Sequence, residues 1–203
     1  MVRPRPESAA EFWDQRYEQN SIPWDLDEPN PVFVRLSKEF SPGKLVIPGA
    51  GRGHEAIQFA QRGFSVTAID FSPRAVDHIT QQAGELHLEI ETWLGDLFDL
   101  PEKFFGRFDY VLEQTCYCAI DPDKRSDYEQ TAWDLLRPKG ELFGLWFPLN
   151  KPRKAGGPPW GVQVENVKKQ FRRWKIREAG FPPDSLPSRR GNEYYFRFQK
   201  PEV

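Results

Sequence analysis

The sequence predicts an α/β protein with a Rossmann-like, seven-stranded, mostly parallel sheet that carries helices on both faces. Short apolar runs rich in β-branched residues alternate with segments whose apolar residues recur at helical spacing. A glycine-rich turn, Gly49-Ala50-Gly51-Arg52-Gly53, directly follows the first such run. The next run, residues 64–69, ends at Asp70, about 20 residues beyond the glycines. These three observations are typical of a sheet that binds a ligand at the carboxyl ends of its strands.

The glycine turn predicts a site for a nucleotide-type ligand. Alternate glycines let backbone N–H groups approach a ligand closely, and the helix that follows presents unpaired N–H donors. The dinucleotide pattern needs a third glycine where this chain has His54, and Gly53 comes one position early. This register favours S-adenosylmethionine, which has no pyrophosphate, over NAD. Asp70 is expected to accept hydrogen bonds from both ribose hydroxyls.

The bulk composition narrows the classes of function. With 203 residues and no low-complexity linker, we expect residues 1–203 to form a single domain. A net charge of -2 argues against a nucleic-acid or anionic-membrane partner, so we expect a small-molecule partner. Cys116 and Cys118 match no metal or redox motif and the histidines are scattered, so no metal is expected. No leader or membrane-spanning run is apparent, which predicts a soluble, cytoplasmic protein, and we expect a monomer.

The first predicted helix, residues 9–19, groups three aromatic residues on one face: Phe12, Trp13 and Tyr17. Trp24 follows in the motif Pro23-Trp24-Asp25. Two interpretations are open. The aromatic residues pack this helix on the core, or residues 1–28 form a lid whose rings face a sulfonium cation.

The elements up to residue 112 follow from helix-start signals and short apolar runs. Pro31 and Pro73 stand at the first helical position, and Ser72 is an N-cap. The first of these two helices is expected to bury Val32, Phe33 and Leu36. The predicted helices cover residues 31–40, 55–61 and 72–83, and the predicted strands cover residues 44–47, 64–69, 88–94 and 108–112.

Polar and thiol side chains follow the third and fourth predicted strands. Asp96, after Gly95, is either a turn cap or an acceptor for an adenine amino group. Gln114 and Cys116 come just after the fourth strand, where open α/β sheets bind ligands, although packing explains them equally well.

The C-terminal part continues with a helix over 122–136, stopped by Pro138-Lys139-Gly140, and a strand over 141–147. Residues 148–162 are irregular and are expected to form a substrate-side loop. A helix over 164–171 and antiparallel strands over 174–179 and 193–198 complete the sheet. Five basic residues are either a nucleic-acid patch or a solvated helix face: Lys168, Lys169, Arg172, Arg173 and Lys175.

Taken together, these motifs resemble the thiopurine S-methyltransferase superfamily, and within it most closely the thiol and halide methyltransferases. The resemblance covers nearly the whole chain. The motifs that carry it are Pro23-Trp24-Asp25, Pro48-Gly49-Ala50-Gly51-Arg52-Gly53, Asp70, Gly95-Asp96-Leu97-Phe98, Cys118-Ala119-Ile120 and Gly156-Gly157-Pro158-Pro159-Trp160.

The resemblance implies a class I S-adenosylmethionine-dependent methyltransferase. The implied cofactor contacts are Trp13, Tyr17, Trp24, Gly49, Gly51, Gly53, Asp70, Asp96, Leu97 and Gln114. The expected substrate pocket consists of Phe12, Gln114, Cys116, Tyr117, Trp146 and Trp160. Tyr17 stands where the plant enzymes have tryptophan. Gln114 stands where plant members have tyrosine and mammalian thiopurine enzymes have arginine, which leaves the acceptor open.

The expected reaction is an in-line methyl transfer to a small soft nucleophile: a thiol, hydrogen sulfide, a halide or thiocyanate. Halides and thiocyanate are already anions, and free thiols ionise partly at neutral pH, so no acid or base residue is assigned. Transfer to a thiopurine or to a selenium or tellurium species is the alternative within the family. Outside it, the alternatives are an NAD(P)-dependent oxidoreductase and a non-catalytic module that binds a cofactor or RNA.

Overall fold

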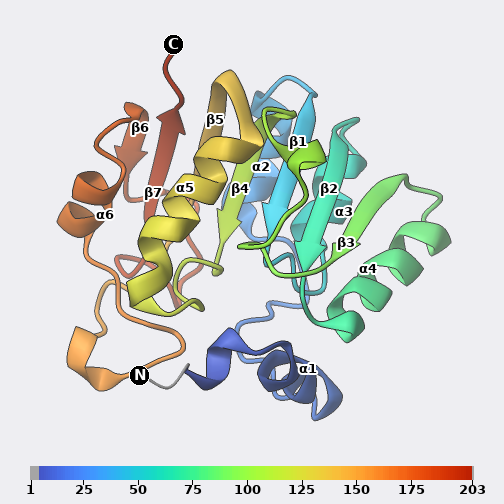
Figure 1. Ribbon diagram of the computed structural model, residues 1–203, viewed down its shortest axis with the longest axis horizontal. Helices are drawn as coiled ribbons and strands as arrows, with labels where there is room; N and C mark the ends of the chain where they lie inside the picture. The colour runs from blue at the N-terminus through green and yellow to red at the C-terminus, as the bar shows by residue number, and fades with distance from the viewer. Residues whose placement is uncertain (1–4, 203) are drawn as a thin grey trace.

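The computed structural model describes residues 5–202 and contains one seven-stranded sheet of order β3-β2-β1-β4-β5-β7-β6 (Figure 1). The strands are β1 (Lys44–Pro48), β2 (Ser65–Asp70), β3 (Ile90–Leu94), β4 (Phe108–Gln114), β5 (Leu136–Trp146), β6 (Lys175–Gly180) and β7 (Tyr194–Gln199). Strand β7 is antiparallel to both of its neighbours, and the other pairs are parallel. The predicted fold class is therefore confirmed.

Helices cover both faces of this sheet. They are α1 (Ala10–Glu18), α2 (Pro31–Glu39), α3 (His54–Ala60), α4 (Pro73–Glu85), α5 (Arg125–Leu135) and α6 (Val164–Gln170), with short 3-10 turns η1 (Pro6–Ser8), η2 (Glu102–Phe104), η3 (Pro122–Lys124) and η4 (Arg153–Ala155). Side chains alternate along β1, so that Leu45 and Ile47 join the apolar cluster with α2 and α3, whereas Val46 joins the cluster with α5 and α6. In Figure 1, α5 lies in front of the sheet and α2 and α3 lie behind it.

The predicted helix starts of α2 and α4 are confirmed by their caps. The Asn30 side chain accepts a hydrogen bond from the Val32 amide at 3.0 Å, and Ser72 Oγ accepts one from the Ala75 amide at 3.3 Å. Each cap satisfies an N–H group that the helix itself leaves unpaired. The predicted apolar stripe of α2 is fully buried: Val32, Phe33 and Leu36.

The boundary between α5 and β5 differs from the prediction. A 3-10 turn occupies residues 122–124, α5 ends at Leu135, and β5 begins at Leu136, five residues before the predicted start. Leu136 pairs with Phe108 of β4, and the register then shifts before Glu141 pairs with Tyr110. Lys139 takes a left-handed backbone with φ of 64°, so the predicted helix stop is an irregularity inside the strand.

The carboxyl ends of the parallel strands meet at one edge of the sheet, and the N-terminal segment lies across it. In Figure 1 this edge is at the bottom, where α1 and the orange loop at residues 148–162 lie. Hydrogen bonds from Trp160 help to connect that loop to its surroundings. The Trp160 amide donates to the Cys118 carbonyl at 2.7 Å, and Trp160 Nε1 donates to Glu7 Oε1 at 3.0 Å. Segments distant in sequence therefore enclose this edge.

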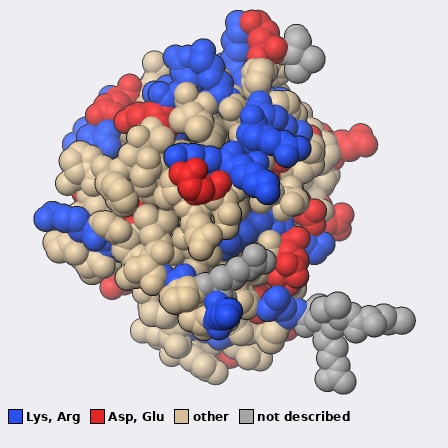
Figure 2. All heavy atoms as spheres, turned by 90° about the vertical axis from the view of Figure 1, so that its left-hand side faces the viewer, with Lys and Arg blue, Asp and Glu red and all other residues tan. Residues whose placement is uncertain are grey.

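Part of the basic run around α6 and β6 is paired with acidic side chains. Figure 2 shows this face, where Lys and Arg side chains gather in the upper part with some acidic and uncharged side chains among them. Lys168 pairs with Glu165 at 2.8 Å, and Arg173 pairs with Glu129 at 2.7 Å. These contacts favour the solvated-face interpretation. Among residues 5–202, no helix is long and apolar enough to cross a membrane.

Candidate active site

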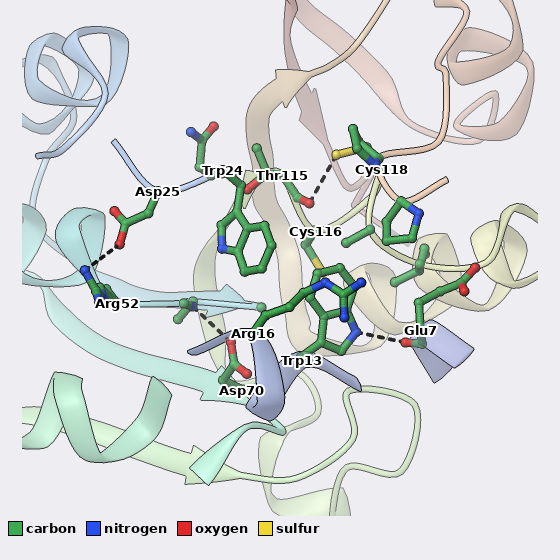
Figure 3. A pocket seen from close by; sticks show the side chains of 18 of the residues that line it. Glu7, Trp13, Arg16, Trp24, Asp25, Arg52, Asp70, Thr115, Cys116 and Cys118 are labelled. Atoms are coloured by element: carbon green, nitrogen blue, oxygen red, sulfur yellow. Dashed lines mark hydrogen bonds and ion pairs between the residues drawn. The ribbon is translucent and has the colours of Figure 1, made fainter. Parts of the chain in front are cut away.

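A cavity of about 780 Å³ lies at the carboxyl edge of the sheet, which is within the roughly 300–1,000 Å³ typical of small-ligand pockets (Figure 3). Residues that follow or end four parallel strands line it: Gly49 after β1, Asp70 at the end of β2, Asp96 after β3 and Gln114 at the end of β4. Parallel strands bring these positions together, although up to 65 residues separate them in sequence.

The glycine turn forms the floor of this cavity beside β1. Gly49, Gly51 and Gly53 have φ values of 61°, 57° and 78°, a left-handed backbone that favours glycine. A Cβ on Gly49 would lie 2.9 Å from Cys116 Sγ, and one on Gly51 would lie 3.2 Å from the Tyr17 hydroxyl. Gly53 does not line the cavity, because it is buried as the N-cap of α3. Glycine at these two positions therefore lets the turn pack closely against Cys116 and Tyr17 at the edge of the cavity.

Asp70 joins the turn to the end of β2. Its Oδ2 accepts a hydrogen bond from the Gly51 amide and its Oδ1 accepts one from the Ser72 amide, each at 2.9 Å. The residue is only 8% exposed, and burial raises the pKa of Asp70 to about 6. A buried carboxylate with further lone pairs toward a cavity is suited to accept hydrogen bonds from ligand hydroxyls.

Three aromatic side chains of the N-terminal segment line the opposite side of the cavity. The rings of Trp13 and Trp24 meet edge to face at 5.3 Å, and those of Tyr17 and Trp24 meet at 5.9 Å. These rings pack on one another and also line the cavity, where Figure 3 shows Trp13 and Trp24. Such faces attract a cation.

Polar contacts hold this segment against the sheet edge. Asp14 accepts a hydrogen bond from Ser72 Oγ at 2.7 Å, at the start of α4. Asp25 lies 2.7 Å from His54 Nε2 and 3.3 Å from Arg52 Nη1, beside the glycine turn. Polar side chains of this segment therefore anchor it beside the cavity, in addition to the aromatic rings that line the cavity.

Four aromatic residues predicted to line the substrate pocket lie outside the cavity lining: Phe12, Tyr117, Trp146 and Trp160. Tyr117 and Trp146 belong to the apolar cluster beneath α5 and α6, where Trp146 packs edge-on against Phe196 and Phe198. Phe12 is covered by the Arg16 guanidinium at 3.4 Å from its ring centre. Trp160 is used in the buried contact with Glu7.

The turn after β4 carries the remaining predicted pocket residues. Gln114, Cys116 and Cys118 all line the cavity, and Cys118 Sγ donates to the Thr115 carbonyl at 3.2 Å (Figure 3). Burial raises the pKa values of both cysteines, so their thiols are neutral and unsuited to act as nucleophiles. The Gln114 Oε1 atom is buried and has no hydrogen-bond partner among the described residues.

A buried glutamate, whose role the sequence did not predict, holds this turn in place through hydrogen bonds. Glu113 is 1% exposed, accepts a hydrogen bond from the Tyr117 amide at 2.9 Å, and also accepts one from the Tyr128 hydroxyl. Burial raises the pKa of Glu113 to about 7. Because Tyr128 comes from α5, Glu113 links that helix to the turn that presents Cys116.

Asp96 and Leu97 occupy the far end of the cavity. Asp96 Oδ1 accepts a hydrogen bond from the Phe98 amide at 2.9 Å, which is the turn-cap role expected for an aspartate after glycine. Both residues also line the cavity. The cap therefore fixes the Asp96 side chain at the edge of the cavity.

Residues 8–198 match the family profile described as thiopurine S-methyltransferase. The chain belongs to this family.

Curated relatives agree with the assignment to the thiopurine S-methyltransferase family. A probable thiol methyltransferase 2 of Arabidopsis thaliana is 31% identical over 166 residues, covering 80% of this chain and 72% of the relative. Thiocyanate methyltransferase 1 of the same plant is 28% identical and covers 98% of this chain and 92% of the relative. The chain is therefore an S-adenosylmethionine-dependent methyltransferase, which decides against the predicted alternatives of an oxidoreductase or a non-catalytic module.

A solved structure supports the fold of this thiopurine S-methyltransferase family member. The 1,6-didemethyltoxoflavin-N1-methyltransferase of Burkholderia thailandensis, with bound 1,6-didemethyltoxoflavin and S-adenosylhomocysteine, matches with a TM-score of 0.76 at 18% identity. The match covers 100% of this chain and 93% of that chain.

The cavity suits S-adenosylmethionine, which supplies an electrophilic methyl group on a positively charged sulfur. Asp70 would hold the ribose hydroxyls, and Asp96 and Leu97 would contact the adenine ring. The methionine part would lie beside Gly49 and Gly51, with Trp13, Tyr17 and Trp24 facing it. Nine of the ten predicted cofactor residues line the cavity, and Gly53 does not.

Cofactor affinity is expected to fall as the pH drops through about 6, because only ionised Asp70 can accept hydrogen bonds with both oxygens. Hydroxyl donors favour the carboxylate, so binding lowers the pKa of Asp70. Cofactor affinity is therefore constant above about pH 6, the pKa of Asp70 without ligand, and weakens by up to tenfold per pH unit below it. Calorimetric titration with S-adenosylhomocysteine between about pH 5 and pH 8 measures this, with circular dichroism to show that the fold persists. A constant affinity across that range would contradict the assignment of Asp70.

Four cavity residues had no signal in the sequence that pointed to the site: Glu7, Arg16, His54 and Arg189. Arg189 is the most unusual of them. It is 6% exposed, its guanidinium lies over the Phe147 ring at 4.7 Å, and its Nη1 has no hydrogen-bond partner among the described residues. The nearest carboxylate oxygen, Glu193 Oε2, is 3.8 Å from that nitrogen.

Proposed function

We propose that this methyltransferase acts on small soft nucleophiles that are anions, or become anions, at the site: thiols, hydrogen sulfide, halides and thiocyanate. The buried Arg189 guanidinium carries this proposal. Arg189 lines the cavity, and Glu193 Oε2 lies 3.8 Å from its Nη1, so the side chain places a partly compensated positive charge beside the cavity. A cation in a site that excludes water favours an anionic ligand over a neutral one. The thiol and thiocyanate methyltransferase relatives support the same class of acceptor.

The turn after β4 and the residue after β5 add neutral or apolar groups to the cavity lining. Cys116, Cys118 and Phe147 contribute thiols and a ring, and Gln114 contributes an amide with an unpaired oxygen. Soft, polarisable nucleophiles such as iodide or a thiolate interact favourably with such surroundings. Excluding water from the nucleophile would make in-line transfer faster, as long as the site holds both reactants in contact.

Replacing Arg189 with glutamine is expected to raise the KM for thiocyanate at least about tenfold and to leave kcat less changed, because a charge-assisted hydrogen bond is lost from the bound anion. The neighbouring Arg190→Gln variant is a matched control, because Arg190 is exposed and does not line the cavity. Arg189→Lys keeps the charge and should retain part of the affinity. Equal KM values for Arg189→Gln and Arg190→Gln would overturn the anion role.

The proposal also covers the roles of two segments of the chain, its division into domains and its oligomeric state. Residues 1–28 act as an aromatic lid, although residues 1–4 lie outside the described residues, and residues 148–162 act as the substrate-side loop. The chain works as a single domain and as a monomer, with a small-molecule acceptor and without nucleic acid. The ion pairs of Lys168 with Glu165 and of Arg173 with Glu129 support the absence of a nucleic-acid partner from this proposal.

A further inference from the structure

A histidine–aspartate pair lines the cavity but has no part in the contacts assigned so far. His54 is the first residue of α3, directly after the glycine turn, and its Nε2 lies 2.7 Å from Asp25 Oδ1. Both residues line the cavity. The Asp25 side chain is only 6% exposed, and the Asp27 amide donates to Oδ1 at 3.0 Å. The carboxylate is therefore fixed in place, and it fixes the imidazole in turn.

The pair forms across two separate parts of the chain. Asp25 comes from the N-terminal segment that closes the cavity, whereas His54 comes from the fixed glycine turn and helix α3. The pair therefore exists only when the segment lies over the cavity, and closing the segment completes it.

The charges around His54 tune its proton affinity. The hydrogen bond to Asp25 raises the pKa of His54, and the carboxylates of Asp25, Glu55 and Asp27 act in the same direction. Burial of the ring acts in the opposite direction. Arg52 Nη1 lies 3.3 Å from Asp25 Oδ2, so it shares that carboxylate with His54, and Arg189 acts on the neighbouring Glu55 carboxyl. An imidazole held by a carboxylate can accept a proton from a substrate and release it again, as a general base must.

The hydrogen bond also selects the ring nitrogen that can accept a proton. With Asp25 as the partner of Nε2, the proton of the neutral ring is held at Nε2 and the lone pair is left on Nδ1. No other described residue forms a hydrogen bond with Nδ1 in the structure. Arg189 and His54 both line this cavity.

We infer that His54, oriented by Asp25, is the general base for thiol acceptors and has no such role for halides or thiocyanate. This inference rests on the proposed function. The S–H bond of the acceptor breaks, its proton forms an N–H bond at Nδ1, and the bonding pair stays on sulfur as the nucleophilic lone pair. The imidazolium then returns to the neutral form by releasing that proton to water. Acceptors that are already anions carry no such proton, so they bypass His54.

The test compares acceptors that differ in whether they must lose a proton. In His54→Gln, kcat/KM for an aliphatic thiol at neutral pH is expected to fall by about 100-fold or more, while kcat/KM for thiocyanate changes less than about threefold. Thiophenol, which is largely ionised at neutral pH, should behave like thiocyanate. His87→Gln is the matched control, because His87 is exposed and lies outside the cavity.

A second measurement is independent of turnover. Nitrogen NMR of the wild-type protein should show His54 with its proton on Nε2 and a titration midpoint above that of a free imidazole. Asp25→Asn should lower this midpoint and mix the two tautomers, since the charged acceptor at Nε2 is lost.

Equal losses for thiol and thiocyanate in His54→Gln would overturn the inference and make His54 a positioning residue for the N-terminal segment. An unshifted His54 midpoint in the wild type would also overturn it. If the wild-type protein methylates neither thiocyanate nor any thiol, the proposed function fails and the role of His54 fails with it. If His54→Gln still methylates thiocyanate but loses methyl transfer to the aliphatic thiol, the result supports both the proposed function and the role of His54 as a base.

Discussion

Replacing Asp70 with asparagine is expected to weaken the binding of S-adenosylmethionine by about 100-fold or more, because hydrogen bonds to a charged acceptor contribute roughly 1.5–3 kcal/mol each. In Asp70, one oxygen accepts a hydrogen bond from the Gly51 amide and the other accepts one from the Ser72 amide. The side-chain NH₂ group of asparagine would face one of these two N–H donors and could not accept its hydrogen bond. Isothermal calorimetry with S-adenosylmethionine and S-adenosylhomocysteine measures the loss.

Asp77→Asn is the control for Asp70→Asn. Asp77 is an exposed acidic residue on α4, and its replacement changes the net charge by the same amount. Retained affinity in Asp70→Asn would mean that Asp70 only braces the glycine turn, and the ribose assignment would then be incorrect.

The second large effect is expected from Gly49→Ala. The new methyl group meets Cys116 Sγ at 2.9 Å and Cys116 Cβ at 3.1 Å, and alanine is strained at the Gly49 φ of 61°. The two terms together should lower the free energy of unfolding by about 2–4 kcal/mol. The turn must shift to relieve the contact, so cofactor affinity should also fall at least about tenfold. Denaturant unfolding and calorimetry measure the two effects.

Gly106→Ala separates backbone strain from the steric clash. Gly106 has a φ of 65°, and nothing lies within 4 Å of a Cβ placed on it, so its replacement should cost only about 1–2 kcal/mol and leave cofactor affinity unchanged. The double variant Gly49→Ala/Cys116→Gly removes both clashing atoms and should recover part of the lost affinity. Identical behaviour of Gly49→Ala and Gly106→Ala would show that Cys116 does not confine the turn.

The sequence predicted which strand-end residues meet in the cavity, because strand topology determines their position. Residues that follow parallel strands converge on one sheet edge wherever the strands lie in the chain. Gly49, Asp70 and Asp96 therefore reach one cavity once the strand assignments are correct. The predicted strand ends needed to be accurate only to within a residue or two.

The acceptor side was predicted less well because neighbouring side chains on extended backbone point in opposite directions. Trp146 faces the buried cluster, and the next residue, Phe147, lines the cavity. In the turn after β4, Tyr117 is buried between Cys116 and Cys118, which both face the cavity. A shift of one residue therefore exchanges a pocket wall for a core residue.

The remaining site residues could not be predicted because tertiary contacts alone bring them together. Glu7 reaches Trp160 across 153 positions of sequence, and Arg189 comes from a segment without helical or strand periodicity. His54 was noticed only as a departure from the dinucleotide glycine pattern. Its partner, Asp25, lies 29 residues away, so the pair becomes visible only when the N-terminal segment is folded over the glycine turn.

Transfer of an isotopically labelled methyl group from S-adenosylmethionine to thiocyanate, iodide and hydrogen sulfide tests the account most directly. Gas chromatography with mass detection of the headspace and chromatography of the solution follow both products. We expect labelled methyl thiocyanate, methyl iodide or methanethiol to form together with an equal amount of S-adenosylhomocysteine. Binding of S-adenosylmethionine without methyl transfer to any of these nucleophiles would contradict the account.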